Sequence, residues 1–541
     1  MFIAPAEVVR ATSSDDLAQS REQAKTWRSA DMGIPDQFLT DAALHDLSTT
    51  AHQMDYVTFQ RAISAVQSAR IGDYEPIPNI NSAEAIFKQF LAADKIDGWV
   101  YVQEDDGYLH PYLVSDIKFE HADSSREARI KLTMEADSPT IQRPSRTPRL
   151  LLLEDSEIVG KTPEQALTAQ GAFHETPELK ATYQKRRNTY QRIIDEDFAQ
   201  QFVFTGTAIR TEDFKSPKER THRKVIQDVQ PEKIEPLRAV APSILADDEL
   251  GEVPVVTAVA VFDLAAQDFI DVNVSDLTPY EYDENLRDKL VLPEEHVELL
   301  DILTSDISVF TGDIIEGKSA GNVILARGRP GVGKTLTAEV YAEVSHRPLY
   351  SIHTGTLGIN PESIRKNLET AFERAKRWDA VLLLDEADVF VLQRGMELEQ
   401  NAIVAEFLRT LEYYDGLLFL TTNRVDGVDE AILARCAVVI DYHLPSPEDA
   451  RKIWQLLAEG NDVHLSDHLL DELVDTFPSI TPRDIKMILR LALRMAAFRK
   501  QDISIDVFIA AAKYRGITPQ KTPVAIVNYH FFPTAHTKER S

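Results

Sequence analysis

The stretch that decides the fold spans residues 322–335 and reads Asn-Val-Ile-Leu-Ala-Arg-Gly-Arg-Pro-Gly-Val-Gly-Lys-Thr. Its last eight residues match the pattern G-x-x-x-x-G-K-[ST], which folds as a glycine-rich loop between a strand and a helix. The apolar run before the loop predicts the strand, and the sequence LTAEVYAEV after it predicts the helix. Glycines let successive backbone N–H groups close around phosphates, and the helix N-terminus adds positive potential.

The loop therefore predicts a site for a nucleoside triphosphate. We expect Lys334 to reach the β and γ phosphates and Thr335 to offer its hydroxyl to Mg²⁺. The residues expected to surround the phosphates are Gly328, Arg329, Pro330, Gly331, Val332, Gly333, Lys334, Thr335 and Leu336.

A second motif, Val381–Glu386, reads VLLLDE. Its four apolar residues predict a buried central strand, so Asp385 should emerge at the carboxyl edge of the sheet, where ligands bind. Asp385 lies 50 residues after Thr335 and is expected to hold a Mg²⁺-bound water. Glu386 can orient and deprotonate an attacking water.

Four further polar residues are candidates for the same site. Asn423 ends the apolar run Leu417–Thr422 and could position the water or the γ-phosphate; alternatively it only forms a turn. Arg435 could act as an arginine finger in a neighbouring subunit, or it could be a surface arginine, and Arg424 is a weaker candidate for that role. Arg483 begins a predicted helix and could reach the nucleotide, or lie free of it.

Strands and helices alternate from Leu277 to Arg515, which predicts a parallel sheet covered on both faces. Helix starts are predicted at Ser446–Asp449 and Thr481–Asp484, and a stop at Gly460. The expected fold is an α/β P-loop NTPase core with a small helical lid, preceded by an α+β N-terminal region. The predicted divisions are an N-terminal α+β domain at 1–140, a middle recognition region at 141–275, a nucleotide-binding domain at 276–445, the lid at 446–516 and a tail at 517–541.

The amino-terminal half gives local predictions. Tyr56–Arg70 reads as a helix, residues 98–134 as short strands, and residues 254–274 as two more. Three prolines and three arginines in Ser138–Arg149 predict a linker. The remaining predictions are a helical stretch from Thr162 through residue 198, whose Lys185–Arg187 is a basic patch or a solvated helix face, and an exposed loop or hairpin at 211–238.

Composition limits the partners. The formal net charge is −29, and residues 1–300 hold 31 Lys and Arg against 53 Asp and Glu. Such a surface repels phosphate backbones, so nucleic acid is an improbable partner. The single cysteine, Cys436, excludes a disulfide framework and fits a reducing cytosol. The apolar runs are far shorter than the ~20 residues of a membrane span, so we expect a cytoplasmic protein without a membrane segment.

Together these motifs resemble the AAA ATPase family, from about Leu277 to Gly516. The similarity is most detailed in VLLLDEADVFVLQRG and FLRTLEYYDGLLFLTTNRVDGVDEAILAR, and these stretches look like AAA-domain ATPases common in fungi and some bacteria. The resemblance implies binding of ATP with Mg²⁺, a helical lid and usually a hexameric ring. It makes Gly328–Thr335 the Walker A loop, Asp385 and Glu386 Walker B, Asn423 sensor 1, Arg435 the arginine finger and Arg483 a residue near sensor 2.

The sequence departs from the family pattern at three places. Arg329 stands where the family usually has proline. Thr354–Pro361, TGTLGINP, has no aromatic residue where many relatives carry a pore loop, so polypeptide threading does not follow from the resemblance. Arg435 is a single arginine where many relatives have two.

Three functions fit these observations. The first is an ATP-driven machine that remodels or disassembles a protein partner chosen by residues 1–275. The second is a nucleic-acid motor or loader with the same core, and the third is a scaffold whose assembly nucleotide gates. In a ring Arg435 would act in trans, because the inferred chain order puts it on the far edge of the sheet from Gly328.

Overall fold

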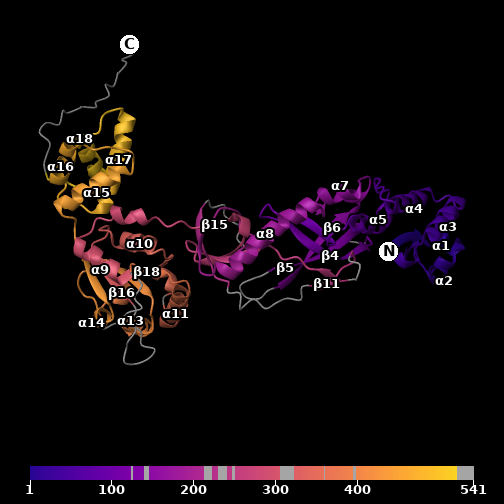
Figure 1. Cartoon of the computed structure of the whole chain (residues 1–541), viewed down its shortest axis with the longest axis horizontal. Coiled ribbons are helices and arrows are strands. Elements are labelled where there is room, and N and C mark those ends of the chain that lie inside the picture. Colours follow the sequence, from indigo (N-terminus) through magenta and orange to yellow (C-terminus); the bar gives the residue numbers. More distant parts are fainter. Residues whose placement is uncertain are drawn as a thin grey trace, which may run out of the picture. The chain divides into compact units, whose positions relative to one another are not determined.

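The computed structural model describes residues 1–122, 126–138, 145–211, 222–229, 240–245, 250–304, 322–358, 360–393 and 398–520. The chain divides into two compact units, Met1–Tyr280 and Glu281–Ser541 (Figure 1). The predicted finer boundaries inside these units stay predictions. The predicted tail from residue 521 onward lies outside the described residues.

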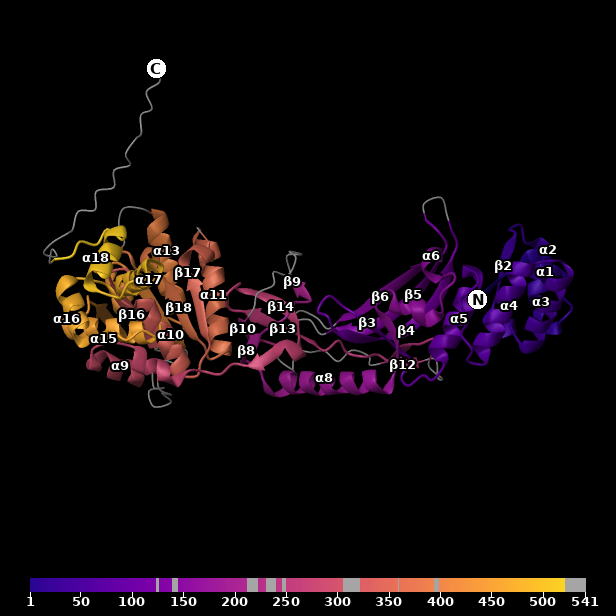
Figure 2. The same cartoon turned by 90° about the horizontal axis from the view of Figure 1, so that it is seen from above.

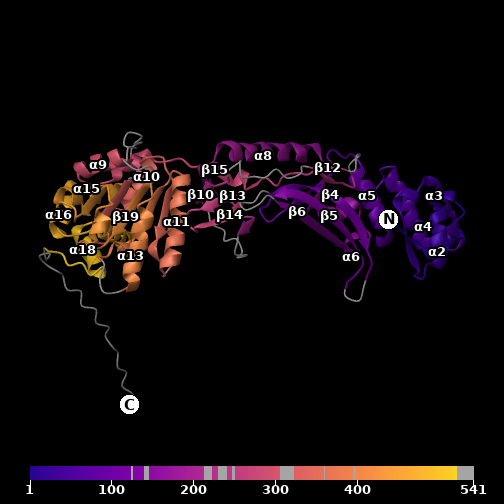
Figure 3. The same ribbon diagram turned by 90° about the horizontal axis from the view of Figure 1, so that it is seen from below.

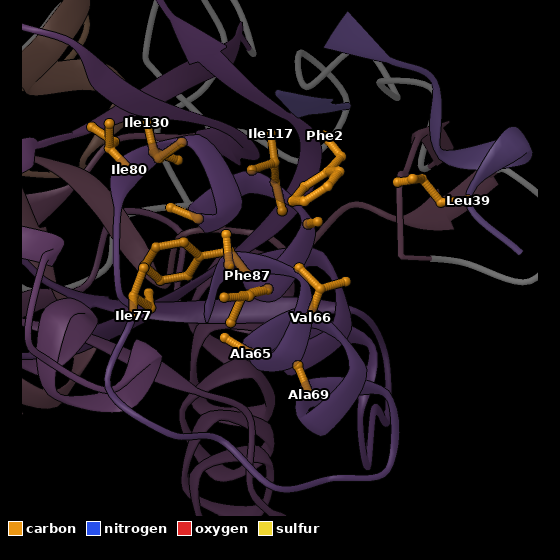
Figure 4. Packing of buried hydrophobic residues seen from close by; sticks show 14 of the residues in the cluster. Phe2, Leu39, Ala65, Val66, Ala69, Ile77, Ile80, Phe87, Ile117 and Ile130 are labelled. Carbon is orange, nitrogen blue, oxygen red and sulfur yellow. The ribbon is translucent and has the colours of Figure 1, made fainter. Parts of the chain in front are cut away.

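The first unit begins with packed helices and a two-stranded ribbon. Its elements are β1 (Phe2–Pro5), α1 (Ala6–Ala11), α2 (Ala18–Thr26), β2 (Asp31–Ile34), α3 (Asp41–Gln53), α4 (Val57–Arg70) and α5 (Ile80–Ala92). Helix α4 confirms the helix predicted over Tyr56–Arg70. Figure 4 shows how side chains of this region share one core with the following strands, since Phe87 of α5 lies in one buried cluster with Ile117 and Ile130.

A five-stranded antiparallel sheet follows, in the order β6-β5-β4-β3-β7. Its strands are β3 (Trp99–Gln103), β4 (Leu109–Glu120), β5 (Arg129–Ser138), β6 (Ser145–Glu154) and β7 (Ala172–His174). The strands predicted within residues 98–134 are confirmed. The predicted linker Ser138–Arg149 is wrong. Its described residues from Ser145 onward belong to β6, and β6 pairs with β5, so the strands before and after residue 140 belong to one sheet. Pro148 is tolerated there because β6 is an edge strand.

The predicted single helical stretch after Thr162 is also wrong. It contains α7 (Pro163–Thr168), strand β7 and then α8 (Pro177–Glu196), with the short α6 (Asp155–Ile158) before it. Gly171, at a φ of +68°, lies in the turn between α7 and β7. The Thr176 side chain then accepts a hydrogen bond from the Leu179 N–H at 3.3 Å and starts α8 anew.

The first unit ends in a six-stranded antiparallel sheet of order β15-β8-β10-β13-β14-β9. The strands are β8 (Gln201–Phe204), β9 (Arg210–Thr211), β10 (Arg223–Gln227), β13 (Ala258–Asp263), β14 (Asp268–Asn273) and β15 (Leu277–Pro279); β11 (Val240–Pro242) and β12 (Leu250–Glu252) form a separate ribbon. Figure 2 shows α8 beside this sheet, and Ile193 of α8 shares its core.

The six-stranded sheet includes a strand within the charged segment 211–238. Residues 223–227 form a central strand and not the predicted loop or exposed hairpin, since β10 pairs with both β8 and β13. The rest of that prediction, at 212–221 and 230–239, lies outside the described residues. The two strands predicted within 254–274 are confirmed as β13 and β14, and β15 pairs with β8, so Leu277–Pro279 belong to this sheet.

The second unit contains a fully parallel five-stranded sheet of order β17-β18-β19-β16-β20. Its strands are β16 (Asn322–Gly328), β17 (Leu349–His353), β18 (Val381–Asp385), β19 (Leu417–Thr422) and β20 (Val438–Tyr442). Both faces of the central strands are buried: Leu383 and Phe419 face the core of α10, and their neighbours Leu384 and Leu420 are fully buried as well. The predicted α/β core with a covered parallel sheet is confirmed.

Helices complete the second unit. Those around the sheet are α9 (Glu294–Thr304), α10 (Lys334–Val344), α11 (Pro361–Arg377), α12 (Asp388–Val391), α13 (Leu398–Leu411) and α14 (Glu430–Leu433). The lid is α15 (Pro447–Glu459), α16 (Asp467–Thr476), α17 (Pro482–Arg499) and α18 (Ile505–Tyr514). Figure 3 shows the lid helices grouped beside the sheet. Their own core centres on Trp454 and Phe508, and Ser446 and Thr481 cap α15 and α17 as predicted.

One topological expectation is wrong. Arg435 precedes β20, and β20 pairs directly with β16, so Arg435 is not across the sheet from Gly328. Gly328 pairs with Tyr442 at the carboxyl end of β20, whereas Arg435 lies before its amino end. The two residues are therefore separated along the strands, by roughly 20 Å.

We expect a truncated chain that begins at Glu281 to remain folded, because the second unit has its own core. A chain that begins at Asn322 should be less stable, since it lacks Leu300, a fully buried member of that core, and the Val297 carbonyl that accepts from Tyr341. Thermal melting and soluble yield of the two chains test this. Equal behaviour of both would show that α9 is dispensable.

Candidate functional site

The glycine-rich loop is held in a shape that needs glycine. Gly331 and Gly333 have φ values of +84° and +115°, in the left-handed region, and Gly333 precedes the first residue of α10. A Cβ on Gly328 would lie 2.4 Å from the Tyr442 carbonyl oxygen of the neighbouring strand. The loop is therefore pressed against β20 and opens directly into a helix N-terminus, as a phosphate site requires.

Lys334 is buried and bound to three neutral oxygens. Its Nζ donates to the carbonyls of Gly328 at 2.8 Å and Arg329 at 2.9 Å, and to Asn423 Oδ1 at 3.0 Å. Burial lowers the pKa of Lys334, although the nearby carboxylates of Asp385 and Asp388 oppose this shift. A phosphate placed against the ammonium would stabilise its charged form.

The other loop residues frame this lysine. Val332 is buried, whereas Arg329, Pro330 and Leu336 are exposed. The arginine that replaces the usual proline thus contributes its carbonyl to Lys334 while its side chain faces solvent.

The two predicted metal ligands lie together. The Thr335 hydroxyl donates to Asp385 Oδ1 at 2.9 Å, although they come from α10 and β18. A hydroxyl and a carboxylate are the oxygen donors that Mg²⁺ prefers, and this ion commonly takes few protein ligands and several waters. The donor set therefore fits the predicted ion.

The sequence did not reveal Thr421, which fixes this pair. Its hydroxyl donates to the same Asp385 Oδ1 at 2.5 Å, and its Oγ1 accepts the Glu386 N–H at 3.0 Å. Thr421 is 2% exposed and is the last residue but one of the apolar strand β19. The only available sign was a threonine pair, Thr421 and Thr422, at the end of an otherwise apolar run.

Glu386 has an unusual backbone. Its φ is +55°, in the left-handed region that non-glycine residues seldom adopt, and such strain clusters at functional sites. The Thr421 hydroxyl holds its N–H, and the Thr354 hydroxyl donates to its carbonyl at 3.3 Å. The side chain of Glu386 is exposed at the carboxyl end of β18.

Asn423 is anchored by a residue that sequence reasoning also missed. Asp388 Oδ1 accepts the Asn423 N–H at 2.9 Å and the Thr422 hydroxyl at 2.5 Å. The Asn423 side chain is then free to accept from Lys334, so one amide joins the ends of β16 and β19. An acid two residues after Glu386 was the available sign. Arg424, the weaker finger candidate, follows directly and donates its N–H to Thr422 Oγ1 at 3.1 Å.

Arg435 lies away from this cluster. Its guanidinium donates to the Ala431 carbonyl at 3.2 Å and forms an ion pair with Glu412 at 3.5 Å. Its buried Nε makes no hydrogen bond within the described part of the chain. The structure thus does not bring Arg435 to the nucleotide loop of its own chain.

Arg483 lies beside the loop. Its N–H donates to the Gly331 carbonyl at 3.1 Å, and a Cβ on Gly331 would lie 2.8 Å from the Arg483 Cβ. The start of lid helix α17 is therefore docked on the glycine-rich loop. The Arg483 side chain is exposed, and its charge helps to lower the pKa of Lys334.

A pocket adjoins the loop and was not foreseen. Its walls come from Val291–Pro293 and His296, from Asp441–Pro445 at and after the end of β20, and from the lid, and it reaches Val332 of the loop. The lid residues are Asp449, Ile453 and Pro482. A flat, partly apolar group attached to the phosphates could enter between the core and the lid here.

Comparisons with known proteins agree with this geometry. Residues 324–444 match the family model described as "ATPase family associated with various cellular activities (AAA)". This segment is therefore an AAA ATPase domain, and the predicted resemblance, the P-loop fold and the ATP hydrolase class are confirmed.

Similar sequences extend beyond that segment. A 26S proteasome regulatory subunit homolog of Methanothermobacter marburgensis is 27% identical over 183 residues, which cover 32% of this chain and 49% of that protein. The ATPase family gene 2 protein homolog B of Homo sapiens is 31% identical over 118 residues, 20% of this chain and 16% of that protein. The ATP-dependent zinc metalloprotease FtsH 3 of Synechocystis is 28% identical over 202 residues, 34% and 32% of the two chains. This chain thus spans less than half the length of these relatives.

Among solved structures, the crystal structure of the FIGL-1 AAA domain in complex with ADP is similar at 23% identity. It covers 42% of this chain and 83% of that one, with a TM-score of 0.34. In the part of the chain that the structure describes, every helix is too short or too polar to cross a membrane.

The Thr421 hydroxyl gives a testable prediction. Replacing it by Thr421→Val keeps the shape but removes a hydrogen bond to a carboxylate, which should cost about 2 kcal/mol of unfolding free energy and slow ATP hydrolysis. Urea unfolding and steady-state turnover measure the two effects.

Thr410→Val is the matched control. Thr410 is also buried, and its hydroxyl donates to the neutral Glu406 carbonyl at 2.9 Å in α13. We expect a loss of about 1 kcal/mol or less and normal turnover. Identical turnover defects in both variants would contradict a specific role for Thr421.

Proposed function

We propose that this chain uses ATP hydrolysis by its AAA domain to remodel or disassemble a protein partner. The observation that carries the hydrolytic part is the meeting of five polar side chains where β16, β18 and β19 end. These residues are Lys334, Thr335, Asp385, Glu386 and Asn423.

Each has a task in this proposal. Lys334 would exchange its carbonyl partners for phosphate oxygens, because a charged acceptor is the stronger partner for an ammonium. Thr335 and Asp385 would hold Mg²⁺, which when bound neutralises charge on the phosphates. The pocket lined by Val291–Pro293, His296 and the lid would take the nucleoside.

Glu386 is proposed as the general base. Its backbone is fixed by hydrogen bonds from both sides while its side chain is exposed, so the carboxylate can meet a water without disturbing the strand. It would accept a proton from that water as the water attacks the γ-phosphorus, and the bond from that phosphorus to the bridging oxygen breaks, so that ADP leaves. Asn423, fixed by Asp388, would position the water or the γ-phosphate.

Glu386→Gln should bind ATP normally and hydrolyse it at least about 100-fold more slowly, since an amide cannot accept the proton. Nucleotide binding is measured by calorimetry and turnover by phosphate release. Glu362→Gln, an exposed glutamate in the first turn of α11, is the control and should leave both unchanged. Equal turnover in wild type and Glu386→Gln would remove Glu386 from this role.

We further propose a homo-oligomeric ring, hexameric as is usual in the family, in which Arg435 acts on the nucleotide of a neighbour. Arg435 lies roughly 20 Å along the strands from Gly328, which is well beyond the reach of an arginine side chain. A second subunit could bring it to the γ-phosphoryl group, where an added guanidinium is worth about 10³–10⁵ in rate.

Arg435→Ala should therefore bind ATP yet hydrolyse it poorly, and Lys334→Ala should not bind it. A mixture of the two variants should regain part of the activity. An Arg435→Ala subunit still binds ATP through Lys334, and a Lys334→Ala neighbour can supply Arg435 to that ATP. Turnover at a series of mixing ratios measures this. Full activity of a strictly monomeric species in sedimentation would rule out both the ring and the finger.

The remodelling part rests on two observations. The names of two relatives, a proteasome regulatory subunit homolog and a metalloprotease, point to protein substrates. The first unit, Met1–Tyr280, has its own cores outside the matched AAA segment and could select a client. A nucleic-acid motor is disfavoured by the net charge of −29, while a nucleotide-gated scaffold would show little client-stimulated turnover.

Affinity capture with the Glu386→Gln chain held in its ATP-bound form separates these functions. A protein that is retained with ATP and released without it, and that stimulates wild-type turnover, supports remodelling. Retention of DNA or RNA would support the motor, and nucleotide-dependent assembly without any stimulation would support the scaffold.

A further inference from the structure

Helix α17 carries a stripe of cations on its exposed side. Arg483, Lys486, Arg490 and Arg494 are spaced three, four and four residues apart, which puts them on one face of the helix. All four side chains are exposed. We call these four residues the basic stripe.

The basic stripe is unusual in this chain. The whole molecule has a net charge of −29, yet α17 holds five basic residues and one acid, Asp484. Within the described residues, none of the four makes an ion pair. Two arginines elsewhere in the lid do make ion pairs: Arg451 with Asp467 and Asp471, and Arg515 with Asp484 at 2.8 Å.

The basic stripe begins at the nucleotide loop. The N–H of its first residue, Arg483, donates to the Gly331 carbonyl, and the other three follow along the helix away from that contact. Any neighbour that brings an arginine finger to this nucleotide must therefore come close to the stripe.

The finger arginine itself has an acidic partner. Arg435 forms its ion pair with Glu412, which follows the end of α13. If Arg435 reaches a neighbour's phosphates, the carboxylate of Glu412 comes to the same interface, within one side-chain length of the finger. The phosphates of ATP would repel a carboxylate brought beside them, and cations of the facing subunit would offset that repulsion.

We propose that the basic stripe binds a second copy of this chain, with Glu412 of that copy lying against Lys486 and Arg490. This inference rests on the proposed ring and names the charges that hold it. Copies that each carry −29 repel one another, so assembly needs local opposite charge. The basic stripe begins at the carboxyl end of the strands, and Glu412 lies before the amino end of β19. A head-to-tail contact that closes into a ring joins two such different surfaces of the same chain.

The test is assembly of the full chain, followed by sedimentation velocity with a non-hydrolysable ATP analogue. K486E/R490E should raise the concentration of half-assembly by about tenfold or more, because like charges would then face each other. E412K alone should weaken assembly in the same way. K486E/R490E/E412K together should recover assembly to within about threefold of wild type, since the pair is restored with its signs exchanged.

The matched control is R499E/K513E. It makes the same change in net charge on exposed cations of the lid, and Arg499 lies on the opposite side of α17 from the stripe. Its assembly should equal that of wild type. Thermal melting verifies folding, and if K486E/R490E fails to fold, K486Q/R490Q takes its place with a smaller expected loss.

The outcomes separate the inference from the proposed function. A wild-type chain that stays monomeric overturns the ring itself. A wild-type chain that assembles while K486E/R490E assembles equally well overturns the basic stripe and leaves the ring standing. Loss of assembly without recovery in K486E/R490E/E412K overturns Glu412 as the partner. Normal assembly with lost binding of a DNA or RNA oligonucleotide would assign the stripe to nucleic acid instead.

Discussion

One carboxylate oxygen ties the site together. Asp385 Oδ1 accepts hydroxyl hydrogen bonds from Thr335, in the first turn of α10, and from Thr421, near the end of β19. The nucleotide loop, the strand that carries Asp385 and Glu386, and the strand that precedes Asn423 thus share one point of attachment. Because the same Thr421 oxygen accepts the Glu386 N–H, the backbone of the proposed base is fixed by the atom that also holds the proposed metal ligand, Asp385. A shift of any one strand would be felt by all of these groups.

Most of this core could be predicted from the sequence for a physical reason. The glycine pattern before Lys334, the apolar strand that ends in Asp385 and the run before Asn423 are local signals, each contained in fewer than ten residues. Parallel strands with both faces covered are apolar throughout, so their carboxyl ends were easy to locate. Thr421 and Asp388 were missed because their roles exist only across strands. A threonine at a strand end and an acid in a turn are common, and only the fold shows which backbone they bind.

The first unit was harder to predict. Pro148 and its neighbouring arginines suggested a linker, but a proline on an edge strand loses no ladder hydrogen bond. The helical periodicity of the sequence after Thr162 continues across β7, because a strand of three residues is too short to interrupt the spacing of the apolar residues. The strand β10 lies in a highly charged segment, and its pairing with β8 and β13 depends on residues distant in the chain. In each case a tertiary partner overrode the local signal.

The position of Arg435 depends on how the strands of the second unit pair. Its motif was recognisable, yet its distance from Gly328 could not be read from chain order, since β20 turned out to pair directly with β16. The separation runs along the strands, from the amino to the carboxyl end, and not across the sheet. In the proposed ring, the carboxyl end of the strands of one copy would meet the amino end of the strands of the next, and Arg435 would reach the phosphates of that neighbour. The ion pair between Arg435 and Glu412 would then be the arrangement of the separate chain, and Arg435 would exchange the carboxylate of Glu412 for the more highly charged phosphates of the neighbour's ATP.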